Sequence, residues 1–140
     1  MKSRERFTSE VIETMTAANE EAEGQEVLFY GKLNGEGLLH EVDAAGRGNE
    51  SAAPALFPFM ESGDVVIHNH PSGVLRPSDA DLQVASRLGN QGIGFYIIDN
   101  RVRSVYCVGE PVTQEPKTPL SIDSLSDIIK PGGVMSTEFP

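Results

Sequence analysis

The strongest constraint in the sequence is a short apolar run that ends in two histidines. Val65-Val66-Ile67 is β-branched, which is typical of a buried strand, and His68 and His70 follow it directly. Successive side chains of a strand alternate between its two faces, so both imidazoles are expected on one face, close enough to bind one ion. The run therefore predicts a strand that carries part of a metal site at its end.

A third ligand is expected from the helix that follows this strand. Pro71 and Gly73 end the strand, and Ser78 and Asp81 fall three positions apart in the first turn of a helix predicted over Ser78–Gly89. That turn can face the histidines. Two histidines, one carboxylate and a water make the open tetrahedral site that is typical of catalytic zinc, although such a set can hold iron as well.

Each of these residues also has a simpler interpretation. An isolated His-x-His pair is more often hydrogen-bonded or exposed than bound to a metal, and Ser78 with Asp81 fits a helix-capping pair equally well. Taken singly, the cap is favoured. The metal site is favoured by the set as a whole, because the four residues lie in one strand–loop–helix unit that two prolines stiffen.

The spacing resembles the metal-binding motif of the JAMM (MPN+, JAB) metallopeptidases. The matching positions are His68, His70, seven intervening residues, Ser78, two more residues and Asp81, and the wording HNHPSG…PS..D is most similar to the RadC-like bacterial branch. The resemblance spans about residues 8–110. It implies an α/β fold of the cytidine-deaminase-like (JAB1/MPN) type, with a mixed, mostly antiparallel sheet flanked by helices.

The resemblance also implies a role for each residue. His68, His70 and Asp81 would hold one zinc ion per chain, as a JAMM site does. Ser78 would donate a hydrogen bond to the developing oxyanion. Glu26 would be the general base, because JAMM domains carry their catalytic glutamate after the first helix, at the start of the first strand. By position alone, Glu26 is simply an exposed strand end.

The remaining elements are predicted from periodicity and turn residues. The predicted elements are a helix over Phe7–Glu23 capped by Thr8 or Ser9, strands over 26–33 and 37–42 around an Asn34-Gly35 turn, a loop over 44–50, a short helix over 51–61, and strands over 93–98 and 102–108 joined at Asp99-Asn100.

Two further glutamates are weaker candidates for the general base. They are Glu36 and Glu41, near the returning strand of the first predicted hairpin.

Composition limits the partners and the compartment. The chain has 11 Lys and Arg against 21 Asp and Glu, and this net charge of −10 argues against direct binding to phosphate backbones. Its one cysteine, Cys107, excludes an internal disulfide and a Cys-based zinc site, and is expected to be a small buried hydrophobe in a strand. No signal peptide or membrane-spanning run is present, so a cytoplasmic location is expected.

The composition changes after Gly109. Residues 1–110 are predicted to be the metallopeptidase-like domain, and residues 111–140 a Pro/Gly-containing linker or disordered tail. The end of the tail faintly resembles the lead-in to DinG-like helicase domains, which implies a fused or associated helicase as a partner.

Two functions are left open. The first is zinc-dependent hydrolysis of peptide or isopeptide bonds, with a peptide, a ubiquitin-like protein or a sulfur-carrier-like protein as substrate. The second is a zinc-bearing RadC-like interaction or regulatory module, attached to a DNA-repair or helicase protein and without peptidase activity of its own. A nucleobase deaminase is excluded, because the chain has neither His-x-Glu nor Pro-Cys-x-x-Cys.

Overall fold

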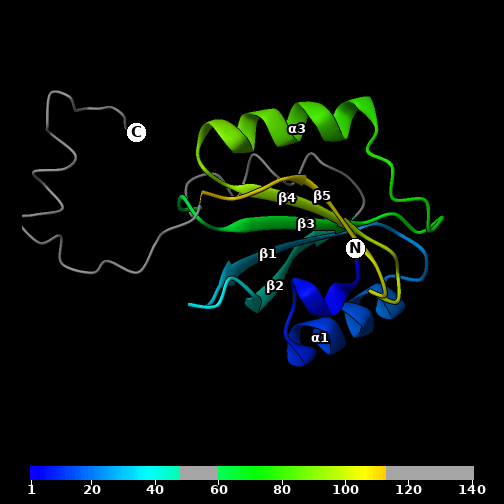
Figure 1. Cartoon of the computed structure of the whole chain (residues 1–140). Coiled ribbons are helices and arrows are strands. Elements are labelled where there is room, and N and C mark those ends of the chain that lie inside the picture. The colour runs from blue at the N-terminus through cyan, green and yellow to red at the C-terminus, as the bar shows by residue number, and fades with distance from the viewer. Residues whose placement is uncertain (48–59, 113–140) are drawn as a thin grey trace, which may run out of the picture.

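The structure, a computed structural model, describes residues 1–47 and 60–112. Within these ranges, helices cover both faces of one sheet (Figure 1). The elements are a 3-10 helix over Ser3–Glu5, α1 over Ser9–Glu21, β1 over Val27–Leu33, β2 over Leu39–Arg47, β3 over Val65–Asn69, α3 over Asp79–Asn90, β4 over Gly94–Ile98 and β5 over Val105–Gly109.

The five strands lie in the order β2-β1-β3-β4-β5. β3 and β4 run parallel, and every other neighbouring pair is antiparallel. A parallel pair needs a crossover connection, and α3 supplies it between β3 and β4. The predicted mixed, mostly antiparallel sheet with flanking helices is therefore confirmed.

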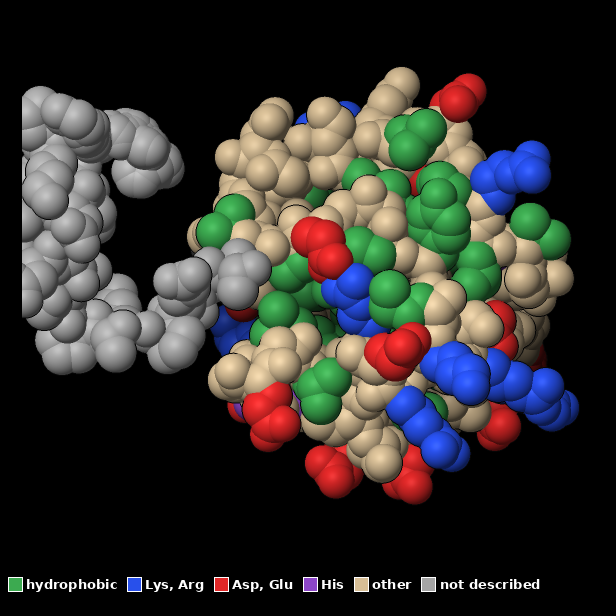
Figure 2. All heavy atoms as spheres, in the orientation of Figure 1, with side chains coloured by type: hydrophobic (Ala, Val, Ile, Leu, Met, Phe, Trp, Pro, Cys, Tyr) green, Lys and Arg blue, Asp and Glu red, His purple; other side chains and the backbone are tan. Residues whose placement is uncertain are grey.

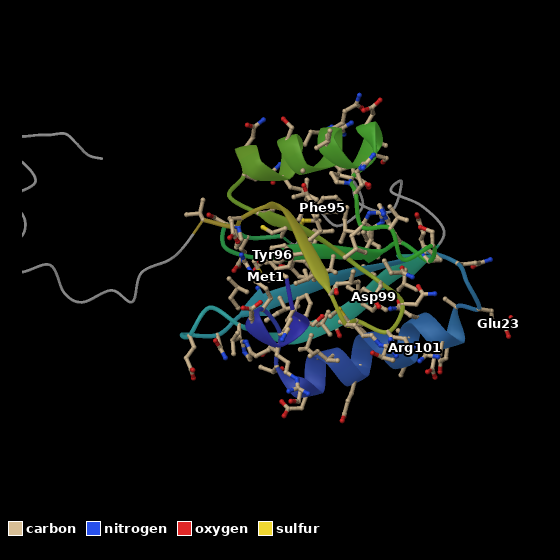
Figure 3. The ribbon with its side chains drawn as sticks, turned by 45° about the vertical axis from the view of Figure 1, so that its right-hand side comes forward. Met1, Glu23, Phe95, Tyr96, Asp99 and Arg101 are labelled. Carbon is tan, nitrogen blue, oxygen red and sulfur yellow. The ribbon has the colours of Figure 1, made fainter. Side chains whose placement is uncertain are left out.

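Each face of the sheet has its own apolar core. Tyr96 lies on the α1 side and its neighbour Phe95 on the α3 side, as the alternation of a strand requires (Figure 3). The buried residues on the α1 side are Phe7, Val11, Met15, Ala22, Val27, Phe29, Leu39, Val65, Ile67, Tyr96, Ile98, Val102 and Val105. Those on the α3 side are Leu28, Val66, Leu88, Ile93 and Phe95.

The first hairpin is longer than predicted. The chain turns after Asn34 as predicted, but the turn runs to residue 38 and has its positive φ at Gly37, so the returning strand begins at Leu39 and not at residue 37. The Asn34 side chain closes this longer turn by accepting hydrogen bonds from the backbone N–H groups of Glu36 and Leu38. The strand after the turn runs on through residues 44–47, where a loop was expected, because its backbone pairs with the inner strand β1. Backbone pairing needs no particular side chains, so Ala44 and Gly46 can continue it. The predicted short helix over 51–61 lies almost entirely outside the described residues.

The β4–β5 hairpin is confirmed, but β5 begins at Val105 and not at Val102. The Asp99 carboxylate accepts hydrogen bonds from the backbone N–H groups of Arg103 and Ser104, at 2.8 and 2.9 Å. Val102 has a positive φ of 53° and also belongs to this turn. A side chain that bonds nearby backbone competes with strand pairing, and this competition delays the strand.

The surface carries charges of both signs. Figure 2 shows acidic and basic side chains interspersed on one face. No helix within the described ranges is long and apolar enough to cross a membrane. Cys107 is half-buried against the α1-side core, and not fully buried as predicted. The predicted tail is described only at Pro111 and Val112.

Candidate metal centre

The end of β3 carries the two histidines toward α3. His68 is 3% exposed and stacks on Phe95 of β4, with ring centroids 5.3 Å apart and planes inclined by 18°. His70 follows the strand, and its ring meets that of His68 edge-on at 4.9 Å. Burial lowers the pKa of His68 below its ordinary value and outweighs the opposing charge of Asp81. The His68 imidazole is therefore neutral near pH 7, as a metal ligand must be.

Asp81 caps α3 and faces both histidines at once. Its Oδ2 accepts a hydrogen bond from the Ser78 backbone N–H at 2.8 Å, and the Ser78 hydroxyl accepts one from the Asp81 N–H at 3.1 Å. The capping interpretation is therefore correct. The same carboxylate places Oδ1 2.9 Å from His68 Nε2 and Oδ2 3.1 Å from His70 Nε2.

Asp81 is ionised although it is fully buried. Burial acts to raise the pKa of this carboxyl, but the Ser78 backbone hydrogen bond and the adjacent imidazoles outweigh burial, and the pKa lies below its ordinary value. A carboxylate between two imidazoles is a donor set that suits zinc.

The His70 ring is held with its lone pair toward Asp81. Its Nδ1 lies 2.8 Å from the backbone carbonyl of Val74, which can only accept, so Nδ1 carries the proton. In a neutral ring Nε2 then has no proton to give to the carboxylate. Metal-binding histidines commonly have this arrangement, with the second ring nitrogen bonded to a carbonyl or carboxylate.

His68 Nε2 and Asp81 Oδ1 form a second close pair of atoms. Both atoms are buried and lie 2.9 Å apart, yet neither has a hydrogen-bond partner among the described residues. Buried polar atoms without partners are costly, and a cation between Nε2 and Oδ1 would satisfy both. The residues present therefore fit a bound cation.

Glu26 approaches the same histidines from β1. It immediately precedes that strand, and its Oε2 lies 3.9 Å from His68 Nδ1. One possible ligand atom from each of Glu26, His68 and His70 lies within 4.8 Å of the other two. The structure thus brings the predicted base to the predicted ligands, across the antiparallel pairing of Leu28 with His68.

The weaker candidates lie elsewhere. Glu41 is opposite Lys32, at the far end of β1 from Glu26, and contacts His40 at 3.5 Å. Glu36 is exposed in the hairpin turn. The structure brings neither of these glutamates to His68 or His70.

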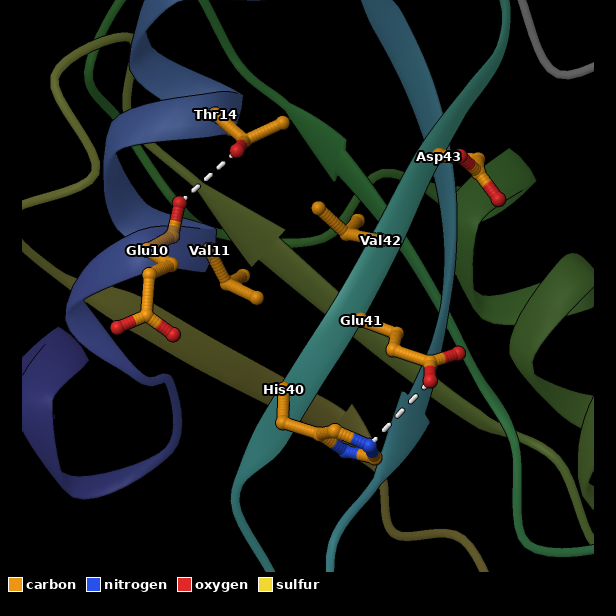
Figure 4. A pocket seen from close by; sticks show the side chains of 7 residues that line it. All are labelled: Glu10, Val11, Thr14, His40, Glu41, Val42 and Asp43. Atoms are coloured by element: carbon orange, nitrogen blue, oxygen red, sulfur yellow. Dashed lines mark hydrogen bonds and ion pairs between the residues drawn. The ribbon is translucent and has the colours of Figure 1, made fainter.

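A separate groove of about 370 Å³ lies between α1 and β2 (Figure 4). Its lining is Glu10, Val11, Thr14, His40, Glu41, Val42 and Asp43. None of the predicted site residues lines this groove.

Two contacts at the site were not predicted. The carbonyl of Val74 orients His70, and the Asn69 side chain bonds the backbone N–H of Val27 at 2.6 Å. The alternation of a strand could have indicated Asn69, since a polar residue between two ligands must point to the opposite, buried face. No local pattern indicates Val74.

Known proteins match this chain in the same stretch of sequence. Residues 62–100 match the family described as the RadC-like JAB domain. A UPF0758 protein of Stutzerimonas stutzeri is 34% identical over 85 residues, covering 61% of this chain and 33% of that protein. One of Porphyromonas gingivalis is 28% identical over 88 residues, covering 56% and 39%. The matches therefore span only about a third of the length of these relatives.

Among solved structures, a JAB1/MPN domain protein from Archaeoglobus fulgidus shares 21% identity with a TM-score of 0.45, over 74% of this chain and 91% of that chain. The resemblance predicted from the His-x-His motif is confirmed, and the match to the RadC-like JAB domain covers residues 62–100.

Proposed function

We propose that the chain is a zinc-dependent hydrolase of peptide or isopeptide bonds, with the ion held by His68, His70 and Asp81. One observation supports this most directly. The Nε2 atoms of two histidines converge on one buried carboxylate, at 2.9 and 3.1 Å, and the Val74 carbonyl keeps the proton of His70 on its other nitrogen. Without a cation, the Asp81 carboxylate faces the unprotonated Nε2 of His70, which is unfavourable. A bound cation would stabilise both groups.

Glu26 is suited to move protons at this site. When bound, zinc lowers the pKa of water toward neutral and polarises a carbonyl. The Glu26 side chain is 34% exposed, so water reaches it, and its Oε2 stands 3.9 Å from His68 Nδ1. Glu26 would take the proton of the attacking water and then pass it to the leaving amine.

Ser78 is suited to stabilise an oxyanion. Its hydroxyl oxygen accepts from the Asp81 N–H, which leaves the hydroxyl proton to be donated. The residue is exposed at the N-terminus of α3, where the helix dipole also favours negative charge. Removal of one such donor typically costs about 3 kcal/mol in transition-state stabilisation.

The first experiment measures bound metal per chain by mass spectrometry of the purified protein. We expect close to one zinc per chain in the wild type and none in His68→Ala and Asp81→Ala. Matched controls are His40→Ala, an exposed histidine on β2, and Asp79→Ala, an exposed carboxylate in the same helical turn as Asp81. Both controls should keep the zinc. A wild type that binds no zinc when it is supplied would overturn the proposal.

The second experiment tests hydrolysis of a peptide and isopeptide library. Glu26→Gln should keep its zinc and lose turnover, while Glu36→Gln should behave as the wild type. Full activity in Glu26→Gln would reject Glu26 as the base. Zinc binding with no hydrolysis of any substrate would instead favour the RadC-like interaction module attached to a larger DNA-repair or helicase protein.

A further inference from the structure

Asn69 lies between the two histidines in the sequence, and its side chain points to the opposite face of the sheet. His68 points toward α3, where it stacks on Phe95. Its neighbour Asn69 must therefore point toward α1, and it is fully buried there. A buried amide has to find partners for both its donor and its acceptor, so its contacts are informative.

The contacts of Asn69, together with one hydrogen bond from Asn19, link four separate parts of the fold. Asn69 Oδ1 accepts a hydrogen bond from the Val27 backbone N–H at 2.6 Å, and Asn69 Nδ2 donates one to Asn100 Oδ1 at 2.6 Å. Asn19 of α1 donates to the Asn100 backbone carbonyl at 3.0 Å. Figure 3 shows the β4–β5 turn, marked by Asp99 and Arg101, beside α1.

The bond to Val27 comes where the β1–β3 pairing ends. The last paired residues at this end are Leu28 and His68, so Val27 has no partner in the backbone ladder with β3. The Asn69 side chain supplies one. It thereby fixes the peptide group that joins Glu26 to Val27, immediately beside the Glu26 side chain.

We propose that Asn69 is a positioning residue that holds Glu26 beside His68 by anchoring the Val27 N–H. The structural part of this inference stands on the hydrogen bonds alone, whereas its kinetic consequence rests on the proposed function. An amide fits the position because it accepts from Val27 and donates to Asn100 together. An apolar residue would leave the Val27 N–H buried and without a partner.

The first test is made on the metal-free protein by NMR. In Asn69→Ala, hydrogen exchange at the Val27 amide should accelerate roughly tenfold or more, and the nuclear Overhauser contacts between Glu26 and the His68 ring should weaken. Asn69→Asp retains an acceptor for the Val27 N–H and should recover most of the protection. Asn100→Ala, which removes only the support for the Asn69 amide, should show a smaller change of the same sign.

The control is Asn19→Ala, a buried asparagine at the other end of the network. It should lower the melting temperature and leave Val27 exchange and the contact between Glu26 and His68 unchanged. Wild-type exchange at Val27 together with an unchanged contact between Glu26 and His68 in Asn69→Ala would overturn the inference.

The second test separates positioning from metal binding. Asn69→Ala should keep close to one zinc per chain and the wild-type KM, while kcat falls about 100-fold, the loss that a misplaced group commonly causes. In a Glu26→Gln background the same change should cost nothing further. Loss of zinc in Asn69→Ala would mean that Asn69 supports the ligands and not the base, which overturns the inference.

Failure of this inference differs from failure of the proposed function. A wild type without hydrolytic activity rejects the hydrolase, and the NMR test still decides whether Asn69 positions Glu26. An active wild type with unchanged kcat and Val27 exchange in Asn69→Ala rejects only the role of Asn69.

Discussion

His68 and Asp81 face each other with Nε2 and Oδ1 2.9 Å apart, and both atoms are buried without a hydrogen-bond partner among the described residues. His68 belongs to β3 and Asp81 to the first turn of α3, so the contact joins the strand to the helix that follows it. A cation between these two atoms would satisfy both, so the stability of the metal-free protein tests whether this contact needs a metal.

Asp81→Asn should separate metal binding from helix capping. An asparagine oxygen can still accept from the Ser78 N–H, and its amide can donate to His68 Nε2, which gives that buried nitrogen a hydrogen-bond partner. We therefore expect the melting temperature of the metal-free protein to be unchanged or higher, while zinc no longer raises it. In the wild type, zinc at 1,000 times its Kd should add about 4 kcal/mol.

The measurement is thermal unfolding with zinc and with a chelator, and Asp79→Asn is the matched control in the same turn. Asp79→Asn should keep the stabilisation by zinc. If metal-free Asp81→Asn melted well below the wild type, the carboxylate would be needed for the fold itself and the contact between His68 and Asp81 would be favourable without a metal.

Glu110→Gln should change how stability depends on pH. The Arg6 guanidinium hydrogen-bonds both carboxylate oxygens of Glu110, one of them at 2.7 Å, and this bond holds the pKa of Glu110 below its ordinary value of 4.5. A lowered pKa in the folded protein means that the stabilisation is present above the ordinary pKa and is lost as the pH falls through the folded one.

The difference in melting temperature between wild type and Glu110→Gln should therefore be largest near neutral pH and vanish in acid. It should be small throughout, because the Glu110 side chain is 59% exposed and solvent screens the pair. A difference that grew toward low pH would contradict this explanation.

Cys107 should react slowly with alkylating reagents. Burial, assisted by the nearby Glu110 carboxylate, raises the pKa of the Cys107 thiol from 9.0 to about 11. Two pKa units correspond to a roughly hundredfold smaller thiolate population at pH 8, and the thiolate is the reacting form. Mass spectrometry of iodoacetamide labelling should show much slower reaction in the native protein than in urea. Equal rates would show that the thiol is open to solvent.

Two glycine substitutions should have opposite signs. A Cβ at Gly31 would lie 2.6 Å from the Glu41 carbonyl oxygen and 2.8 Å from Leu39 Cδ1, so Gly31→Ala should destabilise the protein by about 1–3 kcal/mol. At Gly89, in α3, nothing lies within 4 Å, and Gly89→Ala should stabilise by about 0.5–1 kcal/mol through helix propensity. Urea unfolding measures both, and a stabilising Gly31→Ala would show that β2 can move away from β1.

Local sequence patterns were enough to predict the parts of the site that lie close together along the chain. The alternation of a strand places His68 and His70 together, and the spacing from Ser78 to Asp81 predicts the cap and the carboxylate in the first turn of α3. Such features depend on residues a few positions apart, and backbone geometry relates those residues in the same way in every protein.

The contacts between distant segments depend on how the strands pair in the folded sheet. Glu26 reaches His68 because β1 pairs antiparallel with β3, and the Val27 N–H meets Asn69 for the same reason. β2 continues to Arg47 because its partner strand continues, not because of its own side chains. Strand register across a long sequence separation depends on how the whole sheet packs between its two cores, and no local pattern in this chain specifies that packing.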